Sequence, residues 1–192
     1  MSAGGRERTH VEVRRLEVDD VEAVRTFFAR VPEGDRTFFK EDVSRPDVIA
    51  SWLAESDEHR LIAIVDDEVI GYAAVLRGVA WSRHVAEVRI VIAPEFRQRG
   101  IGRLLAQRAV VEAQDLHIEK LVVDVVAGHD RLFDMFTALG FQKEGRLRAQ
   151  VRSTAGETRD LLVLSHFVAD LASSLADDDE MTSPAGSGAG SS

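Results

Sequence analysis

The feature that most constrains the fold is a short, almost uninterrupted apolar run, Leu121–Val126, in the second half of the chain. Only Asp124 interrupts it, and such a strand is typical of the centre of a sheet covered on both faces. An amphipathic helical pattern precedes the run, over about 100–116, and a shorter one follows it over 130–139, ended by Gly140. The chain is therefore predicted to form an α/β fold in which helices flank a mixed sheet.

Strand and helix patterns alternate along the rest of the body. Helices are expected after Asp19-Asp20 and from Pro46, with a break at residues 32–35 between them. Alternating or continuous apolar patterns predict further strands at 11–18, 61–65, 69–76, 85–93, 141–151 and 159–167. The predicted element order is β-α-α-β-β-β-α-β-α-β-β, with a hairpin turn at 153–157 between the last two strands.

The two ends of the chain differ from the body in composition. Residues 1–8 are polar and are expected to form a flexible N-terminus. Residues 177–192 combine the acidic run Asp177–Glu180 with a glycine- and serine-rich end, which predicts a disordered tail. The 192-residue length fits roughly one domain, which we place at residues 9–176.

Composition and charge exclude several classes of protein. The chain has no cysteine, so disulfides, thiolate metal sites and a cysteine nucleophile are excluded. It has 33 acidic and 24 basic residues, which argues against a dedicated nucleic-acid binder. No apolar run approaches the ~20 residues that span a bilayer, and Met1–His10 lacks the apolar core of a secretory signal. The histidines lack ligand spacing. We therefore expect a cytoplasmic protein without metal, membrane or nucleic-acid partners.

The segment that leads into the long helix is rich in glycine and arginine. Gly100 and Gly102 allow a close approach of the backbone to a ligand. The unpaired N–H groups of the first helical turn would point at that ligand, at the positive end of the helix dipole. Arg97, Arg99 and Arg103 add positive charge to an otherwise acidic chain. Together these residues predict an anion site suited to a diphosphate.

Two interpretations of this anion site compete. Gly100, Gly102 and Ala106, with Asp124 about 20 residues further on, partly match a dinucleotide-binding fingerprint. That fingerprint requires its glycines in the tight turn directly after the strand, whereas here the segment Pro94–Arg99 intervenes. The dinucleotide interpretation is therefore disfavoured.

The residues that carry the second interpretation resemble a known family. The pattern Arg-x-x-Gly-x-Gly at 97–102, after an apolar strand and Pro94, resembles the acyl-CoA-binding motif of the GNAT superfamily of N-acetyltransferases. The segment 129–141, which ends in Gly140-Phe141, is similar to the family's second conserved stretch. The predicted element order is also the family's order, so the resemblance covers roughly residues 9–168.

The resemblance implies a central, mostly antiparallel sheet in which two parallel strands, here 85–93 and 121–126, splay apart. Acetyl-CoA would lie in the gap and bond to backbone groups of Ile90 and Ile92. The Ile92 N–H would donate to the thioester carbonyl as charge develops. The remaining cofactor-binding residues implied are Arg97, Gln98, Arg99, Gly100, Ile101, Gly102, Arg103, His129 and Phe136.

The resemblance also implies direct attack of a primary amine on acetyl-CoA in a ternary complex. Glu87 is the candidate base, because partial burial would raise the pKa of a carboxyl there towards working pH. The alternative is that Glu87 and Arg89, two residues apart on one face of a strand, form an ordinary ion pair.

The general acid is open, because this chain departs from the family pattern. Phe136 stands where many members have a tyrosine, and phenylalanine cannot donate a proton. Tyr72, the only tyrosine, lies on another strand and is interpreted as packing. His129 replaces a frequent asparagine, and either it or water is a candidate donor.

The acceptor pocket is expected at the acidic and aromatic loop Val31–Val43 and at a loop with Trp81 and His84. A small-molecule amine is slightly favoured as the acceptor. A protein lysine or N-terminal amine, a non-catalytic acyl-CoA-binding module, and a protein partner recruited by the acidic tail are alternatives. Homodimers are common in the family.

Overall fold

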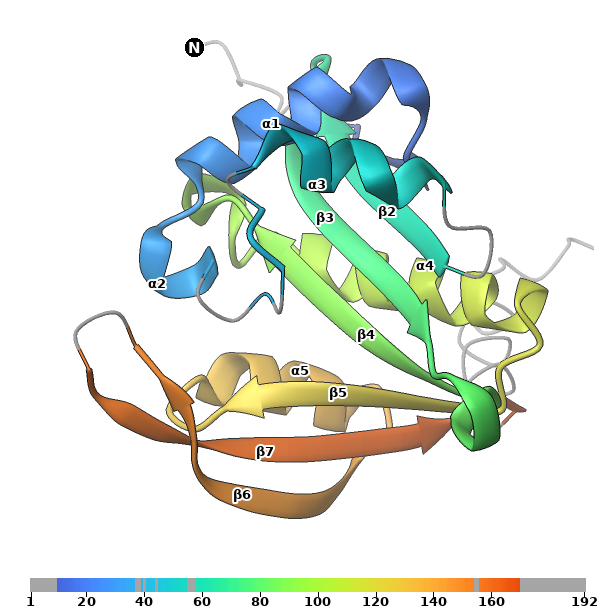
Figure 1. The fold of residues 1–192 in the computed structure, drawn as a ribbon, viewed down its shortest axis with the longest axis vertical. Helices are drawn as coiled ribbons and strands as arrows, with labels where there is room; N and C mark the ends of the chain where they lie inside the picture. Colours follow the sequence, from blue (N-terminus) through green and yellow to red (C-terminus); the bar gives the residue numbers. More distant parts are fainter. Residues whose placement is uncertain are drawn as a thin grey trace, which may run out of the picture.

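The computed structural model describes residues 10–36, 39, 41–43, 45–54, 58–153 and 156–169. The predicted flexible N-terminus and acidic tail lie outside these ranges. One seven-stranded sheet forms the frame, in the order β1-β2-β3-β4-β5-β7-β6 (Figure 1). The strands are β1 (Glu12–Arg15), β2 (Glu58–Val65), β3 (Glu68–Arg77), β4 (Val85–Ile92), β5 (Lys120–Val126), β6 (Gln142–Arg152) and β7 (Thr158–Phe167).

Every neighbouring pair of strands is antiparallel except β4 and β5, which are parallel. The predicted fold class, a mixed and mostly antiparallel sheet flanked by helices, is confirmed. One short helix was not predicted: Glu33–Arg36 forms α2 within the expected break, because the N–H groups of Asp35 and Arg36 both donate to the Pro32 carbonyl.

Helices cover the two faces of the sheet with separate apolar cores. The helices α4 (Ile101–Asp115) and α5 (Asp130–Ala138) pack on one face, where Leu105 and Phe136 are buried. The helices α1 (Val21–Arg30) and α3 (Pro46–Ser51) cover the other face over β2 and β3 (Figure 1), and Val91 of β4 belongs to the same core. The side of the sheet that carries α1 and α3 is called the α1 face below. On this face the helices do not extend past β4, so they leave β5, β7 and β6 uncovered.

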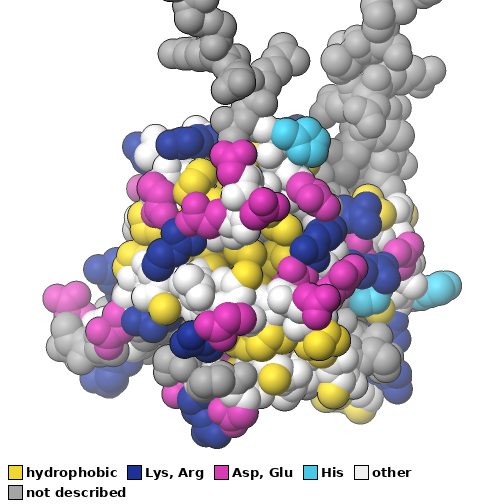
Figure 2. Space-filling view, turned by 90° about the horizontal axis from the view of Figure 1, so that it is seen from above, with side chains coloured by type: hydrophobic (Ala, Val, Ile, Leu, Met, Phe, Trp, Pro, Cys, Tyr) yellow, Lys and Arg dark blue, Asp and Glu magenta, His cyan; other side chains and the backbone are white. Residues whose placement is uncertain are grey.

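Acidic and basic side chains are interspersed on the side of the molecule seen in Figure 2. The helix α1 forms ion pairs of this kind: Arg25 donates to Glu22, and Arg30 pairs with Glu68 at the start of β3. In the part of the chain that the structure describes, no helix is both long enough and apolar enough to cross a membrane.

Candidate functional site

The parallel strands β4 and β5 pair at one end and separate at the other (Figure 1). Their register joins Val85 to Lys120, Ala86 to Leu121 and Glu87 to Val122, and within the described residues it extends no further. The C-terminal half of β4 therefore faces a gap instead of a hydrogen-bonded neighbour on its β5 side.

The backbone groups of Ile90 and Ile92 point into this gap. Ala93 donates its N–H to Ile70 on β3, whereas the His84 carbonyl accepts from the N–H of Lys120 at the start of β5. Because the groups of successive residues in a strand point to opposite sides, the even-numbered residues of β4 face β5. Ile90 and Ile92, the two residues predicted to bond through their backbone groups, therefore both face the gap.

The loop after β4 leads into the start of α4. Residues Pro94–Phe96 form a single 3-10 turn, and Gly100, with a φ of 83°, is the N-cap of α4. A positive φ of this size favours glycine, so Gly100 is required by the turn. The 3-10 turn separates the glycines from the strand end, which confirms that the tight turn of a dinucleotide-binding fingerprint is not formed here.

Gly102 has a packing role in addition to the predicted ligand role. A Cβ atom added there would lie 3.0 Å from Met135 Sδ and 3.2 Å from Ile92 Cδ1. Gly102 therefore allows α4 to start close to both α5 and β4. The first-turn N–H groups of α4 are consequently positioned next to the end of the gap.

The three predicted arginines have different surroundings. Arg97 donates through Nε to the Ile92 carbonyl at 3.0 Å and through Nη2 to Asp35 at 2.5 Å. The Arg99 guanidinium lies 5.2 Å from the centre of the Phe96 ring, and Arg103 is exposed on α4. The link between Arg97 and Asp35 was not predicted, because no local pattern connects residues 62 positions apart.

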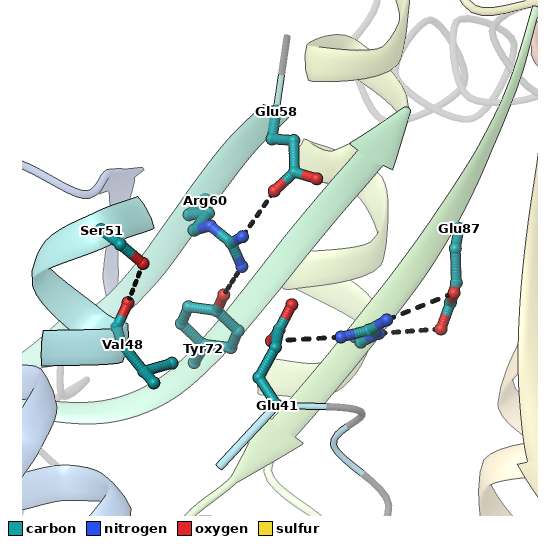
Figure 3. Close-up of polar contacts among 8 residues, drawn as sticks. Glu41, Val48, Ser51, Glu58, Arg60, Tyr72 and Glu87 are labelled. Atoms are coloured by element: carbon teal, nitrogen blue, oxygen red, sulfur yellow. Dashed lines mark hydrogen bonds and ion pairs between the residues drawn. The ribbon is translucent and has the colours of Figure 1, made fainter. Parts of the chain in front are cut away.

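Glu87 and Arg89 form an ion pair, which is the predicted alternative to a catalytic Glu87. Arg89 Nε donates to Glu87 Oε1 at 2.8 Å, and Arg89 Nη1 donates to Glu41 at 3.3 Å (Figure 3). The pair holds Glu87 on the α1 face, beside the point where β4 and β5 separate.

Tyr72 is a core residue, as predicted. Its ring is fully buried among Phe28, Phe39 and Trp52, and its hydroxyl oxygen accepts a hydrogen bond from Arg60 Nη1 at 2.7 Å (Figure 3). Burial raises the pKa of the Tyr72 hydroxyl far above its usual value. Tyr72 is therefore a poor source of a proton near neutral pH.

The two predicted residues of the second motif lie at opposite ends of α5. His129 is the half-buried N-cap of α5, and its carbonyl accepts from the N–H groups of Leu132 and Phe133. Phe136 is 1% exposed and packs edge-on against Phe141. Phe136 thus contributes a buried apolar ring, and of these two residues only His129 can carry a proton for transfer.

The expected acceptor residues are only partly brought together. Phe39 packs beside Tyr72 in the core of the α1 face, and Glu41 reaches Arg89, whereas Phe38 lies outside the described residues. Trp81, 90% exposed, and His84 lie at the beginning of β4, where β4 and β5 are still paired. Trp81 and His84 thus lie at the closed end of the gap, away from Glu41, and their place in the acceptor pocket stays a prediction.

Two surface depressions lie away from this gap. One of about 440 Å³ is lined by α1 and the β2–β3 turn, and one of about 130 Å³ is lined by residues of β1, β2 and 52–53. Neither includes a residue of the predicted site. Among the described residues, no group of three or more histidine or acidic side chains could hold a metal ion.

Comparison with known proteins identifies the family. The sequence pattern of the acetyltransferase (GNAT) family matches residues 22–141, and no curated protein matches the chain significantly. Solved structures also share the fold, and two of them illustrate the similarity. A putative acetyltransferase from Salmonella typhimurium with its cofactor acetyl-CoA is 17% identical, has a TM-score of 0.72, and the match covers 82% of this chain and 94% of that one.

The second solved structure is spermidine N-acetyltransferase from Vibrio cholerae in complex with CoA and spermine. It is 18% identical, has a TM-score of 0.71, and the match covers 84% of this chain and 98% of that one. The family match, the strand order and the separated parallel strands agree with the resemblance seen in the sequence. The chain belongs to the GNAT acetyltransferase family.

Proposed function

We propose that this protein is a cytoplasmic N-acetyltransferase that transfers an acetyl group from acetyl-CoA to a primary amine in a ternary complex. The observation that carries the proposal is the separation of β4 from β5 after Glu87 and Val122, beside the start of α4. The backbone groups of Ile90 and Ile92 suit the amide-bearing pantetheine arm, and the first turn of α4 suits the diphosphate. The acetyl-CoA and CoA bound to the two solved relatives support this assignment.

In the proposed reaction, the amine nitrogen attacks the thioester carbonyl carbon and the carbon–sulfur bond breaks. The Ile92 N–H donates to the carbonyl oxygen while negative charge develops there. The proton of the amine passes to Glu87, directly or through water, and the leaving sulfur takes a proton from His129 or from water. The chain has no cysteine to carry an acyl group, which accords with direct transfer.

The remaining roles at the donor site follow from position. Residues 98–103 supply backbone amides at the start of α4 and positive charge, while Arg97 lies at the end of the gap. Phe136 is a buried ring of α5 that packs against Phe141. A small-molecule amine is the proposed acceptor, and the spermine bound to spermidine N-acetyltransferase from Vibrio cholerae supports this choice.

A second candidate function is a non-catalytic acyl-CoA-binding module, and it is favoured by Phe136, which cannot protonate a leaving thiolate. Titration with acetyl-CoA, followed by thiol release in the presence of polyamines, amino acids and lysine peptides, separates the two candidates. The proposal expects saturable binding and amine-dependent thiol release. Binding without release for any amine would favour the module, and no binding would exclude both functions.

A further inference from the structure

The side chain of Arg97 ties the loop after β4 to α2. Its Nη2 donates to Asp35 Oδ2 at 2.5 Å, while its Nε donates to the Ile92 carbonyl at 3.0 Å. The Arg97 side chain is 40% exposed and that of Asp35 is 26% exposed. The guanidinium is thus held at the end of β4, on the side of the gap, by a carboxylate from a different part of the chain.

The Asp35 carboxylate accepts a hydrogen bond from the Arg97 guanidinium, which a diphosphate bound nearby could also accept. Arg97 lies three residues before Gly100, in the segment that carries the first-turn amides of α4. Phosphate and carboxylate oxygens accept the same charge-assisted bonds from an arginine fork. Asp35 and a diphosphate at the start of α4 therefore compete for Arg97.

The helix α2 is short. It is a helix of four residues, and the N–H groups of Asp35 and Arg36 both rely on the Pro32 carbonyl. Short segments with few protected hydrogen bonds open at low free energy. The next acidic link from the same part of the chain, Glu41 to Arg89, involves an arginine that is only 13% exposed and that also holds Glu87.

We propose that Asp35 is a positioning residue that holds Arg97 in the unliganded protein and yields it to the diphosphate of acetyl-CoA. Binding of the donor then releases α2 from the loop after β4, while the Glu41–Arg89 link stays in place. The inference rests on the proposed function, because it requires the diphosphate to lie at the start of α4. In consequence, binding of acetyl-CoA would change the contacts of α2, on the acceptor side of the protein, through the side chain of Arg97.

The test is titration of the full chain with CoA by calorimetry, combined with hydrogen exchange of the Asp35 and Arg36 amides. In the unmodified protein, CoA is expected to speed exchange at these two amides. D35N is expected to bind CoA about threefold more tightly, in the range of an exposed ion pair, and to show no further change in exchange when CoA is added. D47N is the matched control, since Asp47 forms an exposed 2.5 Å pair with Arg45 on α3.

The outcomes separate the two proposals. If the unmodified protein binds CoA but D35N binds it equally or less tightly, or if CoA slows exchange at Asp35 and Arg36, the role of Asp35 is wrong and the donor site stands. If the unmodified protein does not bind CoA, the proposed function fails and the role of Asp35 fails with it. An equal gain of affinity in D47N would show a general charge effect and would also overturn the inference.

Discussion

Glu87 on β4 lies opposite Val122 on β5, and within the described residues this is the last pair that joins the two strands. The carboxylate therefore stands where the gap begins, and Arg89 holds it there at 2.8 Å. Because Arg89 is on the same strand, its hydrogen bond fixes the direction in which the Glu87 carboxylate points. A catalytic role of Glu87 can therefore be distinguished by mutation from that of a Glu–Arg pair elsewhere on the sheet.

Replacing Glu87 with Gln is expected to lower turnover about tenfold or more near neutral pH, because the amide cannot accept the proton of the amine. The measurement is the steady-state rate of amine-dependent thiol release. Glu58→Gln is the matched control, since Glu58 and Arg60 form the same two-residue Glu–Arg pair at 2.5 Å on β2 (Figure 3). Equal rates in the Glu87 variant and the unmodified protein would remove Glu87 from the mechanism.

Replacing His129 with Asn is expected to lower turnover about tenfold while leaving the affinity for CoA unchanged, because the amide can form hydrogen bonds but cannot supply a proton. Turnover and calorimetric CoA binding are compared with His117→Asn, which changes an exposed histidine outside the site. If His129→Asn keeps full turnover, water is the proton donor and His129 only caps α5.

The sequence predicted the order of elements well, because most strands and helices have one apolar face or a continuous apolar run. The length of the first strand differs most from the prediction: a strand over 11–18 is expected, and β1 covers only Glu12–Arg15. The chain turns away there because Asp20 accepts the N–H of Glu17 and starts a 3-10 turn. Periodicity does not report such a local side-chain bond.

The geometry of the site depended on long-range contacts that no local pattern contains. The gap itself was expected only through the family resemblance, since the register of β4 on β5 is set by tertiary packing. The pairing of Arg89 with Glu87 was foreseeable from their spacing on one strand. The contacts of Arg97 with Asp35 and of Arg89 with Glu41 join distant segments, and only the structure shows them.

Gly140 provides a stability prediction that is independent of catalysis. It has a φ of 90°, and an added Cβ would lie 2.6 Å from His166 Nε2. Gly140→Ala is therefore expected to lower the free energy of unfolding by about 1–3 kcal/mol, through backbone strain and overpacking. Denaturant unfolding is the measurement.

Gly156→Ala is the matched control for Gly140→Ala, because Gly156 also has a positive φ but has open space around it. The Gly140 variant should lose more stability than the Gly156 variant, and adding His166→Ala should remove the crowding part of that loss. Equal losses in the two single variants would show that the contact with His166 does not matter.

Asp20 predicts an acid-dependent loss of stability. Hydrogen bonds from Arg14, at 2.5 and 2.7 Å, lower the pKa of Asp20 below its usual value, and the Glu17 N–H contributes. A lowered pKa in the folded state stabilises the protein above the unfolded pKa, about 3.9, and this contribution is lost as the pH falls through the folded value. The stability difference between the unmodified protein and Asp20→Asn should thus shrink below about pH 4.

Unfolding by denaturant at a series of pH values checks this prediction, with Asp19→Asn as the control for removal of an exposed neighbouring charge. A stability difference for Asp20→Asn that stays constant from pH 7 to about pH 2 would contradict the role of the Arg14 pair.

The central claim, that the gap between β4 and β5 holds acetyl-CoA, is tested most directly by following backbone amide resonances during titration. Saturable shifts are expected at Ile90, Ile92 and residues 100–103, with a larger shift at Ile92 for acetyl-CoA than for CoA. Shifts confined to the depression between α1 and the β2–β3 turn, or equal shifts at Ile92 for both ligands, would contradict it.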